Sequence, residues 1–75
     1  MTLRELRQQS KKTAAQVAEV LGVAERTVAR YEQGIRRLNI EQVIPLAELF
    51  DVSEREVIEA QITTIKNQKS VLPIM

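Results

Sequence analysis

The sequence predicts an all-α domain of five helices joined by short turns, because helix-start signals recur along it. A residue with a capping oxygen stands three positions before a Glu or Gln at four places. These are "TLRE" from Thr2, "TAAQ" from Thr13, "NIEQ" from Asn39 and "SERE" from Ser53. Each signal is followed by apolar residues at helical spacing. The chain has 75 residues, which suits one compact domain with a single core.

The first helix is expected from Leu3 to Gln9, with Leu3 and Leu6 turned inward. The second helix carries an apolar stripe at the i, i+3, i+4, i+7 spacing of one buried face. This stripe consists of Ala14, Val17, Ala18 and Leu21. Gly22 follows where a helix C-terminus favours a left-handed backbone, so we expect it to end the second helix.

The third helix is expected from Glu25 to about Gln33, with Gly34 at its end. At about 100° per residue, its side chains divide into two opposite faces. The apolar face, expected in the core, holds Ala24, Val28 and Tyr31. The opposite face, expected in solvent, holds Arg26, Ala29, Arg30 and Gln33.

The fourth helix is expected to bury one apolar face and to be disturbed by a proline. The inward residues are expected to be Ile40, Val43, Ile44, Ala47 and Phe50. Pro45 removes a backbone donor and clashes one turn back, which predicts either a kink or a separate first turn before it.

The fifth helix is expected to start at Ser53, and the chain after it permits two interpretations. Apolar residues available for burial are Val57, Ile58, Ile62 and Ile65. The segment "ITTI" is β-branched, however, and is also compatible with a strand. A β-hairpin from Ile62 to Ile74, with its turn at 67–70, is therefore an alternative. We divide the chain into a domain at 1–68 and a C-terminal tail at 69–75.

The residue types exclude several kinds of site. The chain has no Cys and no His, so it lacks disulfides, thiolate metal sites and the commonest metal ligand and acid–base group. Because no catalytic cluster can be assembled, we expect a protein without metal or cofactor that is not an enzyme. Arg4, Glu5 and Arg7 interrupt the first apolar residues, so we expect no signal peptide, no membrane segment and a cytoplasmic location.

Charge is distributed unevenly along the chain although the net charge is only +1. Residues 1–37 contain eight basic and four acidic side chains, which gives +4. Residues 38–75 contain three basic and six acidic side chains, which gives −3. The N-terminal half is therefore a candidate surface for an anionic partner.

Two short helices joined by Gly22, Val23 and Ala24 match a helix-turn-helix arrangement. The run "TAAQVAEVLGVAERTVARYEQG", with "LRELR" before it and "NIEQVIPLAELFDVSEREVI" after it, carries a family resemblance. It resembles the five-helix DNA-binding domain of lambdoid phage repressors and Cro, of the xenobiotic-response-element type. The resemblance extends from Leu3 to Ile58 and implies a lambda-repressor-like fold that binds double-stranded DNA.

The resemblance implies roles for individual residues. The residues implied to face base edges are Glu25, Arg26, Ala29 and Arg30. Those implied to hold phosphates are Lys11, Lys12, Thr13, Gln16, Thr27, Gln33, Arg36 and Arg37. An ion pair between Arg7 and Glu32 is implied as a structural contact. Without the surrounding motif, Arg26 and Arg30 would be read as an ordinary solvated helix face.

The chain departs from the family pattern at several positions. Ala14 stands where a glutamine usually braces the third helix, and Ala24 stands where a serine often caps it. Lys11 and Lys12 replace a glycine and an apolar residue. Glu25 would repel phosphates, so it either accepts from a cytosine or restrains Arg26 by local pairing.

These observations predict a sequence-specific transcriptional regulator, a repressor that binds a palindromic operator as a homodimer. The dimer surface is expected in the acidic half, at Ile62, Ile65, Val71, Leu72 and Ile74. The alternatives are a tail that folds back over its own core and a disordered tail. Alternative functions are the antitoxin of a toxin–antitoxin pair, whose tail would hold a toxin, and a protein-interaction module that retains the fold.

Overall fold

A computed structural model describes residues 1–67 of the chain. It contains five helices, which are α1 (Leu3–Gln9), α2 (Ala14–Leu21), α3 (Glu25–Gln33), α4 (Ile40–Phe50) and α5 (Glu54–Lys66). No strand occurs within residues 1–67, so the predicted all-α class is confirmed. The expected tail at 69–75, with Val71, Leu72 and Ile74, lies outside the described residues.

The predicted capping signals start the helices as expected. Thr2, Thr13 and Asn39 each form a complete capping box, in which the cap side chain and the Glu or Gln three residues later exchange hydrogen bonds with backbone N–H groups. At Ser53 the hydroxyl accepts from the Glu56 N–H at 3.2 Å. Each bond satisfies a backbone donor that the first turn of a helix would otherwise leave unpaired.

Glycine ends both helices of the helix-turn-helix. Gly22 closes α2 with φ 69° and Gly34 closes α3 with φ 81°, both in the left-handed region. Apart from Gly22 itself and its two chain neighbours, nothing lies within 4 Å of the position that a Cβ would take at Gly22. The backbone conformation, rather than a lack of space, therefore favours glycine at this joint.

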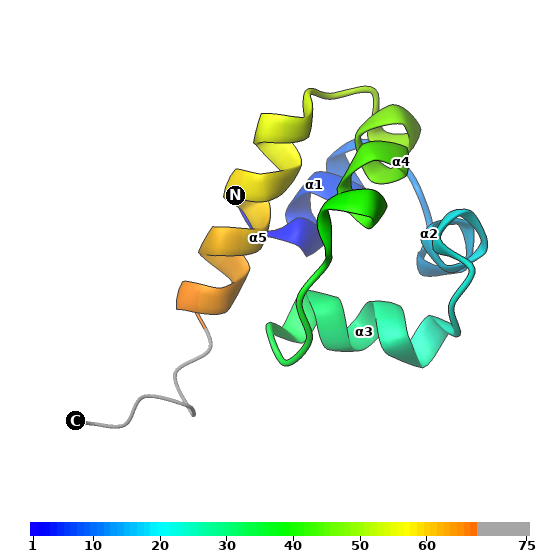
Figure 1. The fold of residues 1–75 in the computed structure, drawn as a ribbon, viewed down its shortest axis with the longest axis horizontal. Coiled ribbons are helices and arrows are strands. Elements are labelled where there is room, and N and C mark those ends of the chain that lie inside the picture. The colour runs from blue at the N-terminus through cyan, green and yellow to red at the C-terminus, as the bar shows by residue number, and fades with distance from the viewer. Residues whose placement is uncertain (68–75) are drawn as a thin grey trace.

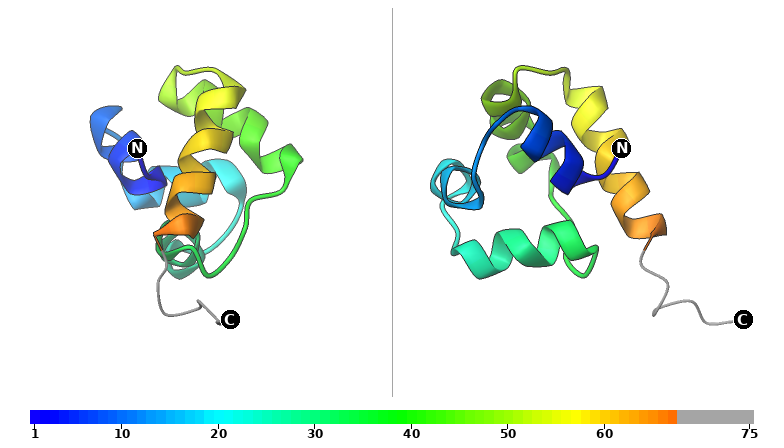
Figure 2. Two further views of the ribbon diagram at one scale, coloured as in Figure 1. Left: turned by 90° about the vertical axis from the view of Figure 1, so that its left-hand side faces the viewer. Right: turned by 180° about the vertical axis from the view of Figure 1, so that it is seen from behind.

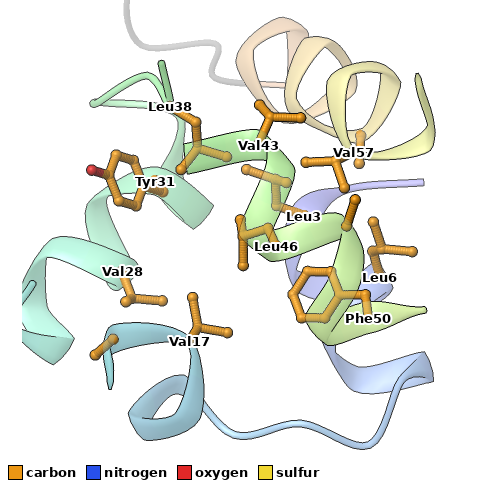
Figure 3. Close-up of a cluster of buried hydrophobic side chains, with 13 residues drawn as sticks. Leu3, Leu6, Val17, Val28, Tyr31, Leu38, Val43, Leu46, Phe50 and Val57 are labelled. Carbon is orange, nitrogen blue, oxygen red and sulfur yellow. The ribbon is translucent and has the colours of Figure 1, made fainter. Parts of the chain in front are cut away.

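The five helices enclose one apolar core, shown in Figure 3. Every helix contributes to it, and Leu38 joins it from the loop between α3 and α4. The largest fully buried side chains are Val28, Val43 and Val57, one each from α3, α4 and α5. α3 is therefore anchored from behind by the same core that holds the C-terminal helices.

The buried face of α4 differs from the prediction. Ile40 and Ile44 are 62% and 44% exposed, whereas Leu46 is buried. Val43, Leu46, Ala47 and Phe50 share one face, and the helical rotation of roughly 100° per residue turns Ile44 away from it. The helix is continuous through Pro45, so the alternative of a separate first turn was wrong.

α5 remains helical through "ITTI", so the strand and hairpin alternative was wrong for residues 62–66. Its buried face consists of Val57, Ala60 and Thr64, while Ile58 and Ile65 are half-buried and Ile62 is 47% exposed. The buried Thr64 hydroxyl donates to the Ala60 carbonyl at 2.8 Å and accepts from the Leu3 N–H at 2.9 Å. A polar side chain is tolerated there because both of its hydrogen bonds are made.

The helices are arranged so that α3 lies along one edge of the molecule, at the bottom of Figure 1. α2 crosses α3 and α5 packs against α1 and α4, as the two views of Figure 2 show. Within the described residues, none of the helices has the length and apolar character that crossing a bilayer requires.

Candidate nucleic-acid interface

The outer face of α3 carries the residues that the sequence places in solvent. Arg26, Ala29, Arg30 and Gln33 are all exposed. Val28 and Tyr31 on the inner face are buried, at 1% and 4% exposure. The helix therefore presents two guanidinium groups and an amide on a rigid support. Such groups can donate to base edges or to phosphates.

The first turn of α3 differs from the prediction in two ways. Ala24 was expected in the core, but it is exposed, because it is the extended N-cap residue and lies outside the helical phase. Its side chain makes no capping hydrogen bond. Glu25 is exposed and, within residues 1–67, forms no ion pair with Arg26. Of the two alternatives for Glu25, local pairing with Arg26 is therefore not the one that the structure has.

The turn between α1 and α2 presents two lysines. Lys11 is exposed and adopts φ 61°, a left-handed conformation that is unusual for a residue with a Cβ. Its N–H donates to the Gln8 carbonyl at 3.0 Å, and the Lys12 N–H donates to the Arg7 carbonyl at 3.1 Å. The left-handed position is the one at which the resemblance described above implies a glycine.

The N-terminus of α2 keeps donors for a further partner. Thr13 accepts from the Gln16 N–H at 3.1 Å, and the Gln16 Oε1 atom accepts from the Thr13 N–H at 2.8 Å. The hydroxyl proton of Thr13 and the amide nitrogen of Gln16 are not used in these two bonds. Both residues are exposed, and a helix N-terminus favours anions.

Arg36 and Arg37 lie in the loop after α3, and both are exposed. This loop lies at the same lower edge of Figure 1 as α3. The Ile35 and Arg36 N–H groups donate to the Arg30 carbonyl at 3.0 and 3.3 Å, and Leu38 is buried. The two arginines are therefore held between the end of α3 and the core.

The ion pair that the resemblance implies is present in the structure. Arg7 donates to Glu32 from Nε at 2.6 Å and from Nη2 at 3.2 Å, and both side chains are largely buried. The hydrogen bond to the Glu32 carboxylate raises the pKa of Arg7 above its usual value. Elsewhere, at the start of α1, the Thr2 backbone N–H bond lowers the pKa of the Glu5 carboxyl.

Three residues outside the predicted set also belong to this surface or support it. Arg4 lines a hollow of about 230 Å³ between α1 and α3, together with Ala29. The Gln42 amide contacts Tyr31, and the Gln61 amide contacts the Leu38 N–H. The capping signal "NIEQ" marks Gln42 as a helix-start residue, but no local pattern identifies its tertiary contact or that of Gln61.

The remaining predicted residues occupy separate positions. Thr27 is half-buried on the first turn of α3. Ile62 and Ile65, expected in a dimer surface, lie on α5, a different helix from the one that carries Arg26 and Arg30. Within residues 1–67, no group of three or more Cys, His, Asp or Glu side chains is placed to hold a metal ion.

Comparisons with known proteins agree with this geometry. A family model described as helix-turn-helix matches residues 3–57. An HTH-type transcriptional regulatory protein of Pyrococcus furiosus is 43% identical over 49 residues, which cover 65% of this chain and 16% of that protein. The HTH-type transcriptional regulator AnsR of Bacillus subtilis is 41% identical over 51 residues, which cover 68% of this chain and 44% of that protein.

The chain thus spans less than half of the length of either relative. No solved structure matches it. The match over residues 3–57 includes every helix from α1 to α4 and the start of α5. The chain therefore belongs to the helix-turn-helix family, in its Cro/C1 form.

Proposed function

We propose that the chain is a sequence-specific regulator of transcription, a repressor that binds a palindromic operator in double-stranded DNA as a homodimer. Its family and the names of its two relatives support a DNA-binding regulator. The observation that carries the proposal is the outer face of α3. Arg26 and Arg30 are exposed there on a helix whose inner face is fixed in the core by Val28 and Tyr31.

In this proposal the α3 face reads bases in the major groove. Each guanidinium of Arg26 and Arg30 can donate two hydrogen bonds to the O6 and N7 atoms of a guanine. The Ala29 methyl can contact a thymine methyl, and the Glu25 carboxylate can accept from a cytosine amino group. Since Glu25 has no ion pair with Arg26, its carboxylate is left for this contact.

Three flanking groups hold phosphates and place the α3 face in register. The α1–α2 turn contributes two ammonium groups, and the start of α2 contributes side-chain and backbone donors. The loop after α3 contributes two guanidinium groups, and α3 itself adds polar side chains. The residues proposed for phosphate contacts are Lys11, Lys12, Thr13, Gln16, Thr27, Gln33, Arg36 and Arg37.

A homodimer fits this function because one helix-turn-helix reads only a short half-site. Two copies bind half-sites that are separated by roughly 34 Å along the duplex, one helical turn. Ile62 is an exposed apolar side chain on α5, and Ile65 beside it is half-buried. We therefore propose α5 as part of the surface that joins the two chains.

The test compares variants on a preferred duplex, selected from a random pool, and on a random duplex. Arg26→Ala and Arg30→Ala should each lose roughly 1 to 3 kcal/mol on the preferred duplex and relax sequence choice. Arg36→Ala should weaken both duplexes alike, because a phosphate contact carries no sequence information. Gln8→Ala, exposed on α1 and outside both the proposed DNA contacts and α5, is the control and should bind as the wild type does.

Fluorescence anisotropy at several salt concentrations measures these effects. The affinity of the wild type should fall steeply as salt rises, since phosphate contacts release counterions. Equal losses on both duplexes for Arg26→Ala would contradict its role as a base reader. A wild type that binds no duplex at low salt would contradict the whole proposal and favour a protein-interaction module.

A further inference from the structure

The loop from 34 to 39 carries two exposed arginines and is held at both ends. At its start, the Ile35 and Arg36 N–H groups both donate to the Arg30 carbonyl, which closes the end of α3. Leu38 inserts into the core near its end. Arg36 completes the first attachment and Arg37 lies between the two, and both are outside any helix.

The attachment at Leu38 includes a hydrogen bond to a side chain of another helix. The Leu38 N–H donates to the Oε1 atom of Gln61 at 2.5 Å. Gln61 lies on α5, 23 positions further along the chain, and its side chain is half-buried. The backbone immediately after Arg37 is therefore fixed to α5 through one side-chain amide.

A second amide joins the end of the loop to α3. The Gln42 Oε1 atom accepts from the Asn39 N–H at 2.9 Å, and its Nε2 atom donates to the Tyr31 hydroxyl at 2.9 Å. One side chain thereby connects the first residue after the loop to the inner face of α3. Both functional groups of the Gln42 amide are used, so its orientation is defined.

We propose that Gln61 and Gln42 are positioning residues that hold Arg36 and Arg37 in place for phosphate binding. This inference rests on the proposed function of DNA binding. A loop that is ordered before binding loses less conformational entropy when it meets the DNA backbone. If the Leu38 N–H lost its acceptor, the loop would gain alternative conformations, and the two arginines would contact phosphate less often.

The test removes the Gln61 contact and the Gln42 contact in turn and leaves the residues that are proposed to touch DNA unchanged. Gln61→Met keeps the length of the side chain and removes the acceptor of the Leu38 N–H. Tyr31→Phe removes the hydroxyl that Gln42 contacts and leaves the capping box at Asn39 intact. Gln8→Met is the matched control, because Gln8 is exposed on α1 and lies outside the proposed interface.

Each variant is measured by anisotropy on the preferred and random duplexes, at temperatures where circular dichroism shows it folded. Gln61→Met should lower the affinity for both duplexes roughly three- to thirtyfold. It should also reduce the salt slope, which is the fall in log affinity per unit rise in log salt concentration, by about one. The ratio between the two duplexes should stay unchanged. Tyr31→Phe should act in the same direction with a smaller loss, and it provides the test if Gln61→Met does not fold.

A double-mutant cycle separates positioning from a general loss of stability. In a chain that already carries Arg36→Ala and Arg37→Ala, Gln61→Met should cause no further loss of affinity. Amide hydrogen exchange at Leu38 should accelerate in Gln61→Met and stay unchanged in Gln8→Met.

Two outcomes overturn the positioning role alone. One is a Gln61→Met chain that binds like Gln8→Met while the wild type binds DNA as proposed. The other is a loss that persists undiminished when both arginines are already alanine. A wild type that binds no duplex at low salt overturns the proposed function first, and the positioning role with it.

Discussion

Arg7 and Glu32 form a bidentate ion pair that joins α1 to α3, and Arg7 also donates from Nη1 to the Lys12 carbonyl at 3.2 Å. One guanidinium therefore connects α3 to the turn that carries the two lysines. The two side chains are 15% and 14% exposed, so water screens the pair only weakly. The orientation of α3 relative to the turn that carries Lys11 and Lys12 depends on this contact.

Arg7→Lys should destabilise the fold, because an ammonium group cannot reproduce the planar fork that reaches Glu32 and Lys12 together. We expect a loss of roughly 1 to 3 kcal/mol in the free energy of unfolding, measured by chemical denaturation. Arg55→Lys is the control, since the Arg55–Glu59 pair at 3.4 Å is exposed, and it should change stability by less than about 0.5 kcal/mol. Equal effects of both substitutions would contradict the proposed importance of the Arg7 fork.

Ionisation of Arg7 should not change the contribution of the Arg7–Glu32 pair to the free energy of unfolding around neutral pH. The pKa of Arg7 is raised in the folded protein. The stability that the charged guanidinium adds is therefore fully present below the usual pKa of arginine, and it is lost only as pH rises through the raised pKa. That range lies far above neutral pH.

Lys11→Gly should raise stability and lower DNA affinity. Lysine in the left-handed conformation carries a steric penalty that glycine avoids, so the free energy of unfolding should rise by up to about 1 kcal/mol. The lost ammonium group should reduce the salt slope by about one. Denaturation and anisotropy on the random duplex measure the two effects.

Asp51→Gly provides the matched control for Lys11→Gly. Asp51 has a similar left-handed backbone, with φ 58°, at the end of α4 and outside the proposed interface. It should change stability in the same direction without changing the salt slope. If Lys11→Gly bound DNA with an unchanged slope, Lys11 would not be a phosphate contact.

Local signals explain why the first three helices could be predicted from the sequence. The bounds of α1 and α3 and the end of α2 agree with the expectation, because the signals at Thr2, Gly34 and Gly22 act within a few residues of themselves. The inner faces of α4 and α5 were less predictable. Ile44 and Ile62 are apolar yet exposed, whereas Thr64 is buried, because the stripe that packs depends on neighbouring helices rather than on hydrophobicity alone.

The site could be predicted in part for the same reason. The outward phase of Arg26 and Arg30 follows from helical geometry, and the structure has them exposed. The missing pair between Glu25 and Arg26, and the bond from Leu38 to Gln61, depend on side-chain placement and on contacts distant in sequence. Neither has a local sequence pattern.

Ile62→Lys should weaken the proposed homodimer while leaving the monomer folded. Ile62 is about half exposed, so the charge does not enter the core, and the free energy of unfolding should change by less than about 0.5 kcal/mol. Sedimentation equilibrium should show a shift toward monomer. Affinity for the palindrome should fall on the order of 100-fold, because the two chains then bind their half-sites separately. Ile44→Lys, of similar exposure on α4, should remain dimeric. An unchanged association constant for Ile62→Lys would place the dimer surface elsewhere.

Ala24→Ser should stabilise α3 by adding the capping oxygen that its first turn lacks. Ala24 has the extended backbone of an N-cap, with φ −76° and ψ 156°, and makes no side-chain hydrogen bond. A serine Oγ atom there can accept from the Thr27 N–H, so the free energy of unfolding should rise by roughly 1 kcal/mol. Ala24→Asp should give a similar gain in stability, but its charge should repel phosphate and lower DNA affinity, whereas Ala24→Ser should bind DNA at least as tightly as the wild type. Thermal denaturation and anisotropy on the preferred duplex distinguish the two variants. Equal affinities for Ser and Asp would mean that the start of α3 lies away from the DNA backbone.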